Sequence, residues 1–201
     1  MKVLAFSDIH ADMKAMRTVA DAAKGADLLI GAGDFCHMRQ GLRDILSVLD
    51  GIAIPMVMVP GNVESADELR RDAPQGAVVL HGQGHEIEGL RLFGLGYAVP
   101  PPPFGDWSCN LDEAEAEVLL GSCDAADILI SHSPPKGVAD RTSTGISVGS
   151  ETVRAAIERV QPRLVLCGHV HECWGERGRI GRSEVVNLGP RPCWFEIEAE
   201  L

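Results

Sequence analysis

The residues best suited to do chemistry are two histidines late in the chain. His169 and His171 lie in the segment LVLCGHVHECWG at residues 164–175, where an apolar run ends in Gly168. On an extended segment, side chains two positions apart point to the same side, so both imidazoles could face one site. Two unrelated surface histidines at a strand end would give the same pattern. Metal binding therefore requires further ligands from the rest of the chain.

Other metal-binding side chains follow short apolar runs in the same way. They are Asp8, His10, Asp34, Asn62 and His132. With the two histidines above they make two carboxylates, four imidazoles and one amide. This set exceeds what one ion uses alongside substrate and water, which predicts two divalent ions that share one carboxylate. Nitrogen and oxygen ligands without sulfur suit Mn, Fe, Ni, Co or Zn, whereas calcium prefers oxygen alone.

Strand and helix patterns alternate along the chain and would bring these residues together. Expected strands cover residues 2–7, 27–33, 55–61, 77–80, 85–89, 91–97, 127–131, 163–168, 184–189 and 193–201, and expected helices cover 12–24, 41–50, 64–73, 111–122 and 150–160, with Ser150 as an N-cap. This order predicts parallel strands covered by helices. Ligands of such sheets bind beyond the carboxyl ends of the strands. Residues 97–110 read as a proline-rich loop, a type of segment that is functional or disordered.

Composition limits the protein class and its partners. The chain has 201 residues, 45% hydrophobic and 23% charged, which indicates one globular domain over residues 1–201. The net charge is −11, and two divalent ions would bring it only to −7, so we expect no nucleic-acid partner. No apolar run approaches the ~18 residues of a membrane span. Six cysteines without a C-x-x-C pair and a very short N-terminal apolar stretch indicate reduced thiols in the cytoplasm.

Five motifs give a family resemblance that covers nearly the whole chain. SDIH at 7–10, GD at 33–34, GN at 61–62, SH at 131–132 and GHVH at 168–171 resemble, in order, the motifs of calcineurin-like metallophosphoesterases. The resemblance implies a four-layer α/β/β/α sandwich with two mixed β-sheets. It also implies a binuclear metal centre, in which Asp8, His10 and His171 hold one ion, Asn62, His132 and His169 hold the other, and Asp34 bridges.

The activity that this resemblance implies is hydrolysis of a small phosphoester by a hydroxide that bridges the ions, with manganese among the metals. Asp34, Asn62 and His169 are then the catalytic residues. Segments 132–140 and 184–190 resemble a small phosphodiesterase-like branch. A phosphomonoesterase and a metal-binding scaffold with little activity are the alternatives. Acidic charge disfavours a nuclease, and the G-D-x-x-D-R-G motif of protein phosphatases is absent.

One departure from the family pattern concerns the proton donor. Many members carry a histidine directly after the asparagine, and it protonates the leaving group; here that residue is Val63. A missing general acid typically costs ~10²–10⁴-fold in rate. His37, Asp140 and Arg141 are further candidates for substrate binding. Glu64 is expected to start a helix, with a hydrogen-bonding role near the site as the alternative.

Overall fold

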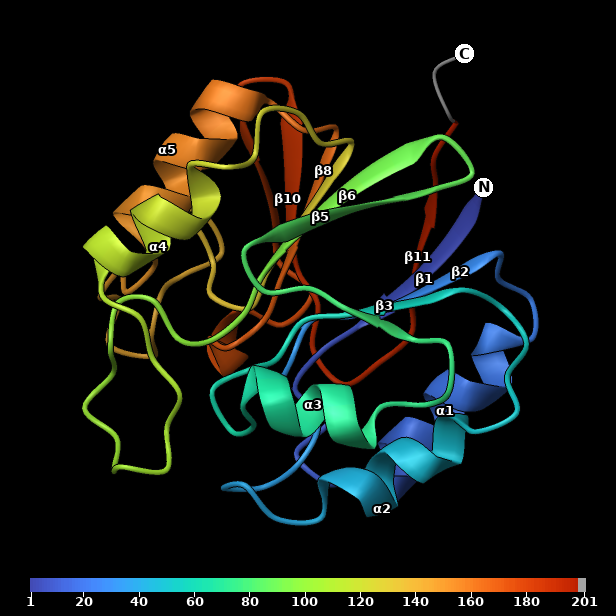
Figure 1. Ribbon diagram of the computed structural model, residues 1–201. Helices are drawn as coiled ribbons and strands as arrows, with labels where there is room; N and C mark the ends of the chain where they lie inside the picture. The colour runs from blue at the N-terminus through green and yellow to red at the C-terminus, as the bar shows by residue number, and fades with distance from the viewer. Residues whose placement is uncertain (199–201) are drawn as a thin grey trace.

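The computed structural model describes residues 1–198 and consists of two β-sheets with helices on both outer sides (Figure 1). The strands are β1 (Lys2–Phe6), β2 (Leu28–Gly31), β3 (Met56–Met58), β4 (Val78–Val79), β5 (Gln83–Ile87), β6 (Leu90–Leu95), β7 (Ile128–Ser131), β8 (Leu164–Cys167), β9 (Arg177–Ile180), β10 (Ser183–Asn187) and β11 (Cys193–Glu196). In the described residues one sheet has the order β11-β1-β2-β3-β4 and the other β5-β6-β7-β8-β10-β9.

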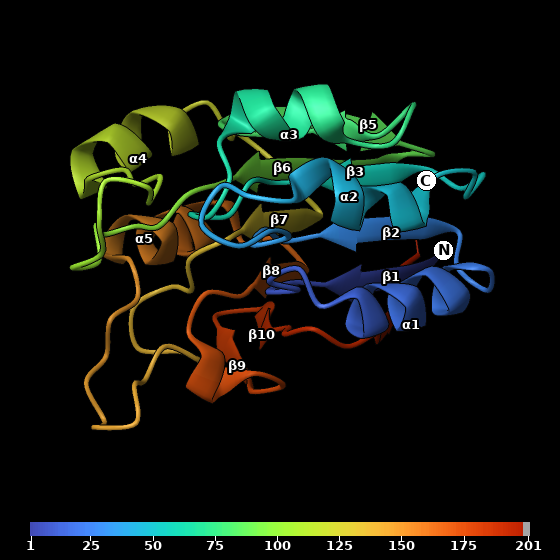
Figure 2. The ribbon, with the colours of Figure 1, turned by 90° about the horizontal axis from the view of Figure 1, so that it is seen from below.

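Both sheets are mixed. The edge strands β11, β5 and β9 each run antiparallel to their neighbour, and the remaining neighbours run parallel. Helices α1 (Met13–Ala23), α2 (Leu42–Leu46) and α3 (Ala66–Asp72) cover the five-stranded sheet, and α4 (Glu113–Leu120) and α5 (Glu151–Val160) cover the other (Figure 2). The predicted four-layer sandwich is confirmed.

Side-chain alternation along the strands explains the layers. In β1, Val3 and Ala5 enter the apolar cluster between the sheets, whereas Leu4 and Phe6 face the helices. In β8, residues 164 and 166 likewise face the other sheet, while 165 and 167 face α4 and α5. Strands that are buried on both faces read as continuous apolar runs rather than as alternating patterns. This is why the sequence indicates the central strands so clearly.

Several predicted boundaries are wrong at the sheet edges. β5 covers 83–87 instead of 85–89, the last strand ends at Glu196, and residues 199–201 lie outside the described part. β9 was not expected, because Arg177–Ile180 is half-exposed and has no apolar pattern. The predicted helix 41–50 divides into α2 and a 3-10 turn, η1 (Ser47–Leu49). Ser150 is confirmed as an N-cap, since its side chain accepts the Val153 N–H.

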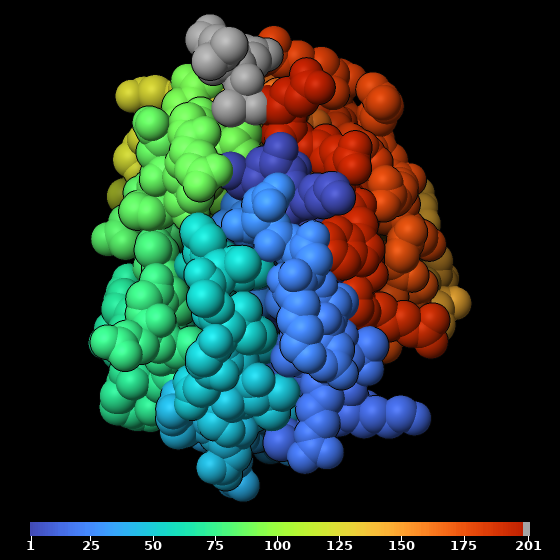
Figure 3. Space-filling view, turned by 90° about the vertical axis from the view of Figure 1, so that its right-hand side faces the viewer, coloured from blue at the N-terminus to red at the C-terminus, as the bar shows by residue number. Residues whose placement is uncertain are grey.

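The two ends of the described chain lie side by side. β1 pairs with β11, and the Met1 amino group donates to the Ile197 carbonyl at 2.8 Å. Figure 3 shows the blue N-terminal residues beside the red C-terminal segment. Among the described residues, none of the helices has the length and apolar character to cross a membrane.

Candidate metal centre

The loops that follow β1 and β2 are joined through their backbones. The Asp8 N–H donates to the Gly33 carbonyl at 2.9 Å, and the His10 N–H donates to the Asp34 carbonyl at 3.0 Å. Asp8, His10 and Asp34 have φ angles of 54°, 45° and 58°. Such left-handed conformations are strained for these residues and persist only where the surroundings enforce them. The strain turns both carboxylates toward the space beyond the strand ends.

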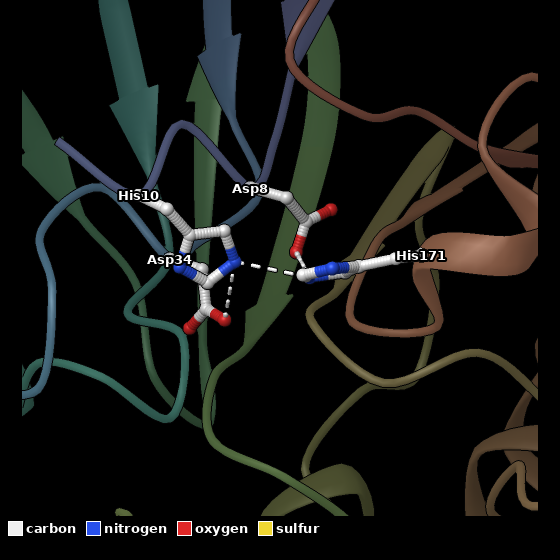
Figure 4. Close-up of side chains that lie close together, drawn as sticks. All are labelled: Asp8, His10, Asp34 and His171. Carbon is white, nitrogen blue, oxygen red and sulfur yellow. Dashed lines mark hydrogen bonds and ion pairs between the residues drawn. The ribbon is translucent and has the colours of Figure 1, made fainter. Parts of the chain in front are cut away.

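A first group of potential ligands lies at this edge. Asp8, His10, Asp34 and His171 each offer one ligand atom, all within 4.8 Å of one another (Figure 4). The Nε2 atoms of His10 and His171 are 3.0 Å apart. His10 Nε2 lies 3.5 Å from an Asp34 oxygen, and His171 Nε2 lies 3.8 Å from an Asp8 oxygen. Four ligands from three separate loops thus converge on one point.

A second group shares Asp34 with the first. Ligand atoms of Asp34, His132 and His169 also lie within 4.8 Å of one another. The Asn62 Oδ1 joins them, at 3.2 Å from His132 Nε2 and 3.0 Å from His169 Nδ1. His132 is held from behind, because its Nδ1 lies 2.8 Å from the Ala32 carbonyl. Such a contact to the far ring nitrogen is the usual way in which a metal-binding imidazole is oriented.

Asp34 stands between the two groups with one oxygen toward each. Its Oδ2 is the atom near His10, and its Oδ1 lies 3.3 Å from His132 Nε2. Oδ1 also accepts the backbone N–H groups of Asn62 at 2.8 Å and Val63 at 3.1 Å. Burial and the charge of Asp8 raise the pKa of Asp34 well above its ordinary value. A cation bound between the two carboxylates would offset their repulsion and favour the ionised form of Asp34.

The surroundings of His10 and His169 favour the neutral imidazole, which is the form that binds metals. Burial lowers the pKa of His10 to about 4, with His171 adding to the effect and Asp8 opposing it. Burial and the neighbouring histidines lower the pKa of His169 well below its ordinary value. Nitrogen and oxygen donors in two clusters fit two divalent transition-metal ions.

Comparison with known proteins agrees with this geometry. The profile of the calcineurin-like phosphoesterase superfamily domain matches residues 1–193. The chain belongs to this superfamily. A UPF0046 protein of Caenorhabditis elegans is 30% identical over 214 residues, which cover 96% of this chain and 70% of that protein. Against two other curated relatives the chain spans only 26% and 35% of their length.

Two solved structures share the fold. TT1561 of Thermus thermophilus superposes with a TM-score of 0.74 at 20% identity, covering 94% of this chain and 88% of that one. A dimetal phosphatase from Danio rerio gives a TM-score of 0.62 at 12% identity, again covering 94% and 88%. At these identities the likeness establishes the fold alone.

The structure brings all seven sequence-predicted residues into the two groups, with Asp34 in both. Their role as metal ligands stays a prediction. The expectation of an extended segment at residues 169–171 is wrong. His169 is left-handed, with φ of 68°, and His171 starts the 3-10 turn η2 (His171–Cys173). The two imidazoles therefore enter different groups rather than one.

Glu64 is a structural anchor of the site and not the start of a helix. Ser65 caps α3, with a capping box formed by Glu68. The Glu64 side chain is fully buried. Its carboxylate accepts the N–H groups of residues 34, 35, 36 and 61 at 2.8, 3.0, 3.3 and 2.6 Å. Burial and the Asp34 charge raise its pKa to about 7. Glu64 thus joins the loops that carry Asp34 and Asn62.

Two other residues support the site, and no pattern in the sequence indicates them. The Trp174 Nε1–H donates to Asp8 Oδ2 at 3.2 Å, and the indole ring lies 4.5 Å from that of His171. The Ser108 hydroxyl accepts the Asn62 side-chain N–H at 3.2 Å. Both contacts orient a predicted ligand.

The three substrate-binding candidates have different environments. His37 is exposed and close enough for its charge to lower the pKa of His10. Asp140 is fully buried and accepts N–H groups from Gly137 at 2.9 Å and Gly149 at 3.0 Å. The Arg141 guanidinium donates to the Gly145 carbonyl at 2.8 Å. In the structure the last two stabilise the loop before α5, and a substrate contact for any of the three stays a prediction.

Proposed function

We propose that the protein is a dimetal-dependent phosphodiesterase that hydrolyses a small phosphoester. The observation that carries the proposal is the shared position of Asp34, whose two oxygens face two separate ligand groups. An ordinary buried ion pair would not need two imidazoles on one side of a carboxylate and two imidazoles with an amide on its other side. Two ions about 3.5–4 Å apart are the usual arrangement for phosphoester hydrolysis.

Each ion has its own protein ligands in this proposal. Asp8, His10 and His171 would hold one ion, and Asn62, His132 and His169 would hold the other, with Asp34 shared. When bound, two such ions lower the pKa of a water molecule and neutralise charge on the phosphate. Mn is one candidate, together with Fe, Ni, Co and Zn.

The chain's own residues set the geometry of the reaction. Asp34 contacts both ligand groups. Asn62 and His169, whose Oδ1 and Nδ1 atoms are 3.0 Å apart, are the other two residues that we propose to be catalytic. The water loses a proton to the solvent, its oxygen bonds to phosphorus, the bond to the ester oxygen breaks, and the leaving group departs as an anion. Val63 is 4% exposed and packs in the apolar cluster with Phe35 and Leu69, so it donates no proton. Esters of acidic alcohols, such as phenols, are therefore the favoured substrates.

The cysteines and the net charge bear on the location and the substrate that we propose. All six cysteines are free, which is consistent with the cytoplasmic location that we propose. The net charge of −11 supports a small substrate rather than a nucleic acid.

The test is a screen of metals against substrates. Protein prepared without metal is loaded with Mn, Ni, Co or Zn and assayed on aryl phosphodiesters, aryl phosphomonoesters and cyclic nucleotides. We expect two bound ions per chain and the highest rate on an aryl phosphodiester. Asp34→Asn should abolish turnover, whereas Asp21→Asn on the exposed face of α1 should not. Metal binding without turnover of any ester would contradict the proposal and favour a metal-binding scaffold. Faster turnover of monoesters than of diesters would identify a phosphomonoesterase instead of a phosphodiesterase.

A further inference from the structure

A largely apolar hollow of about 610 Å³ opens beside the second ligand group. Its wall includes the prolines at 100–103, Phe104, Val148, His169 and Val170. This volume lies within the range of small-molecule sites, which are mostly apolar with a few polar groups. His169 belongs both to the hollow and to the ligand group, so the two adjoin.

The aromatic part of the wall is fixed to the site. The Phe104 ring stacks on Trp107, with centroids 5.6 Å apart and planes at 14°, and stands edge-on to His169 at 6.5 Å. The proline-rich loop of residues 97–110 (yellow-green in Figure 1) also contacts Asn62, whose carbonyl accepts the Cys109 N–H at 2.9 Å. Phe104 nevertheless remains 53% exposed. A ring that is held in place but left uncovered offers a binding face.

The two charged side chains that line the hollow form hydrogen bonds with the backbone of neighbouring loops. The Lys136 ammonium donates to the Ser147 carbonyl at 2.9 Å. The Glu172 carboxylate accepts the Ser143 N–H at 3.2 Å. The hollow is lined by one cationic and one anionic side chain, so its own side chains carry no net charge to attract a second phosphate. A neutral planar group suits this wall better than a charged one.

We propose that the hollow binds an aromatic ring esterified to the phosphate, with Phe104 as the residue that selects it. This inference rests on the proposed function and names its substrate class. The ring is recognised by stacking and edge contacts with Phe104 and by the flat proline surface. A phenol and a nucleobase share this planar chemistry, and the substrates below separate them. In this proposal the ring in the hollow belongs to the ester group that stays on phosphorus, and the leaving phenol that Val63 favours is a separate group.

The test uses three diesters with the same p-nitrophenolate leaving group, so that the chemical step stays constant. Their second ester group is methyl, phenyl or thymidine. We expect kcat/KM for the phenyl ester to exceed that for the methyl ester by about 10-fold, and Phe104→Ala to remove most of this ratio. Trp194→Ala, which removes a similarly exposed ring on β11, should leave the ratio unchanged. A thymidine ester preferred over the phenyl ester identifies a nucleobase as the ring.

A binding measurement separates this inference from the proposed function. Calorimetry on the Mn-loaded parent compares phenylphosphonate with methylphosphonate, which is a comparison that needs no turnover. Tighter binding of phenylphosphonate with no hydrolysis of any ester supports the hollow and refutes the phosphodiesterase. Equal binding of both phosphonates, or a Phe104→Ala variant that keeps the full preference for the phenyl ester, overturns the inference.

Discussion

Gly61 offers the sharpest test of how the metal centre is built. A Cβ atom at this position would overlap the Asp34 backbone nitrogen and Oδ1, and would lie 2.8 Å from Asp34 Cγ. Ordinary contact begins at 3.4 Å. The Cγ contact alone therefore requires the Asp34 carboxylate to move by about 0.6 Å, and the closer overlaps with Oδ1 and the backbone nitrogen require a larger movement. Metal sites tolerate deviations of about 0.2 Å in ligand distance. Gly61→Ala should therefore remove Asp34 from the position that both ligand groups share.

The expected cost follows from the contacts that this movement disrupts. Overpacking a core position costs about 1–3 kcal/mol. The movement also weakens two N–H bonds to the Asp34 carboxylate, from Asn62 at 2.8 Å and Val63 at 3.1 Å, and bonds of this charged kind contribute about 1.5–3 kcal/mol each. Since the loop relaxes in part, we expect a loss of about 3–5 kcal/mol in the free energy of unfolding. Metal affinity should fall by about 100-fold.

Denaturant unfolding and calorimetric titration with Mn measure the two effects. Gly84→Ala is the matched control, because its Cβ would meet only Leu92 and Phe93 atoms, at 3.5 and 3.7 Å. We expect this control to lie within about 0.5 kcal/mol of the parent and to bind metal normally. A Gly61→Ala protein with parental stability and two tight metal sites would refute the reasoning.

Three further predictions concern charge and proton supply. Asp34→Asn should weaken both metal sites and Asn62→Ala mainly one, as metal titrations would show; equal effects on both sites would refute the assignment. Val63→His should raise turnover of poor leaving groups by up to ~10², and a parental rate that is independent of leaving-group pKa would contradict this. The pKa of Glu113 is lowered. Burial acts to raise this pKa, but hydrogen bonds from Ser150 and other groups lower it by more. The stabilisation from ionised Glu113 is thus present above pH 4.5 and lost below it. Glu113→Gln should therefore lower the free energy of urea unfolding by about 1 kcal/mol at pH 7 and by progressively less as the pH falls below 4.5. An equal loss at pH 7 and below pH 4.5 would exclude this role of Glu113.

The sequence predicts the central strands well and the edges poorly, for a physical reason. β1 and β8 are buried on both faces, so their apolar runs admit few other interpretations. β9 lies at a sheet edge with a burial pattern that is mostly exposed or half-exposed, and edge strands need no apolar repeat. Periodicity therefore finds the elements that form the core, and it misses those that only complete a sheet.

The same limit applies to the candidate site. Its potential ligands could be proposed because each follows an apolar run and carries a metal-binding group. The supporting residues could not, because their roles depend on pairings across the fold. Trp174 donates to Asp8 across 166 positions, and Ser108 contacts Asn62 across 46. Glu64 has the same charge as many surface residues, and only its four buried N–H partners distinguish it.

The pairing of the first strand with the last has a consequence for biosynthesis. β1 receives its partner β2 early in translation, but the loop with His169 and His171, and then β11, are made much later than β1. Until then the nascent N-terminal half exposes the apolar face that later meets the other sheet, including Val3 and Ile30. Such surfaces attract chaperones and other nascent chains. Neither ligand group is complete before His169 emerges, so an ion that needs all the ligands of either group would bind only after at least 169 residues have been made.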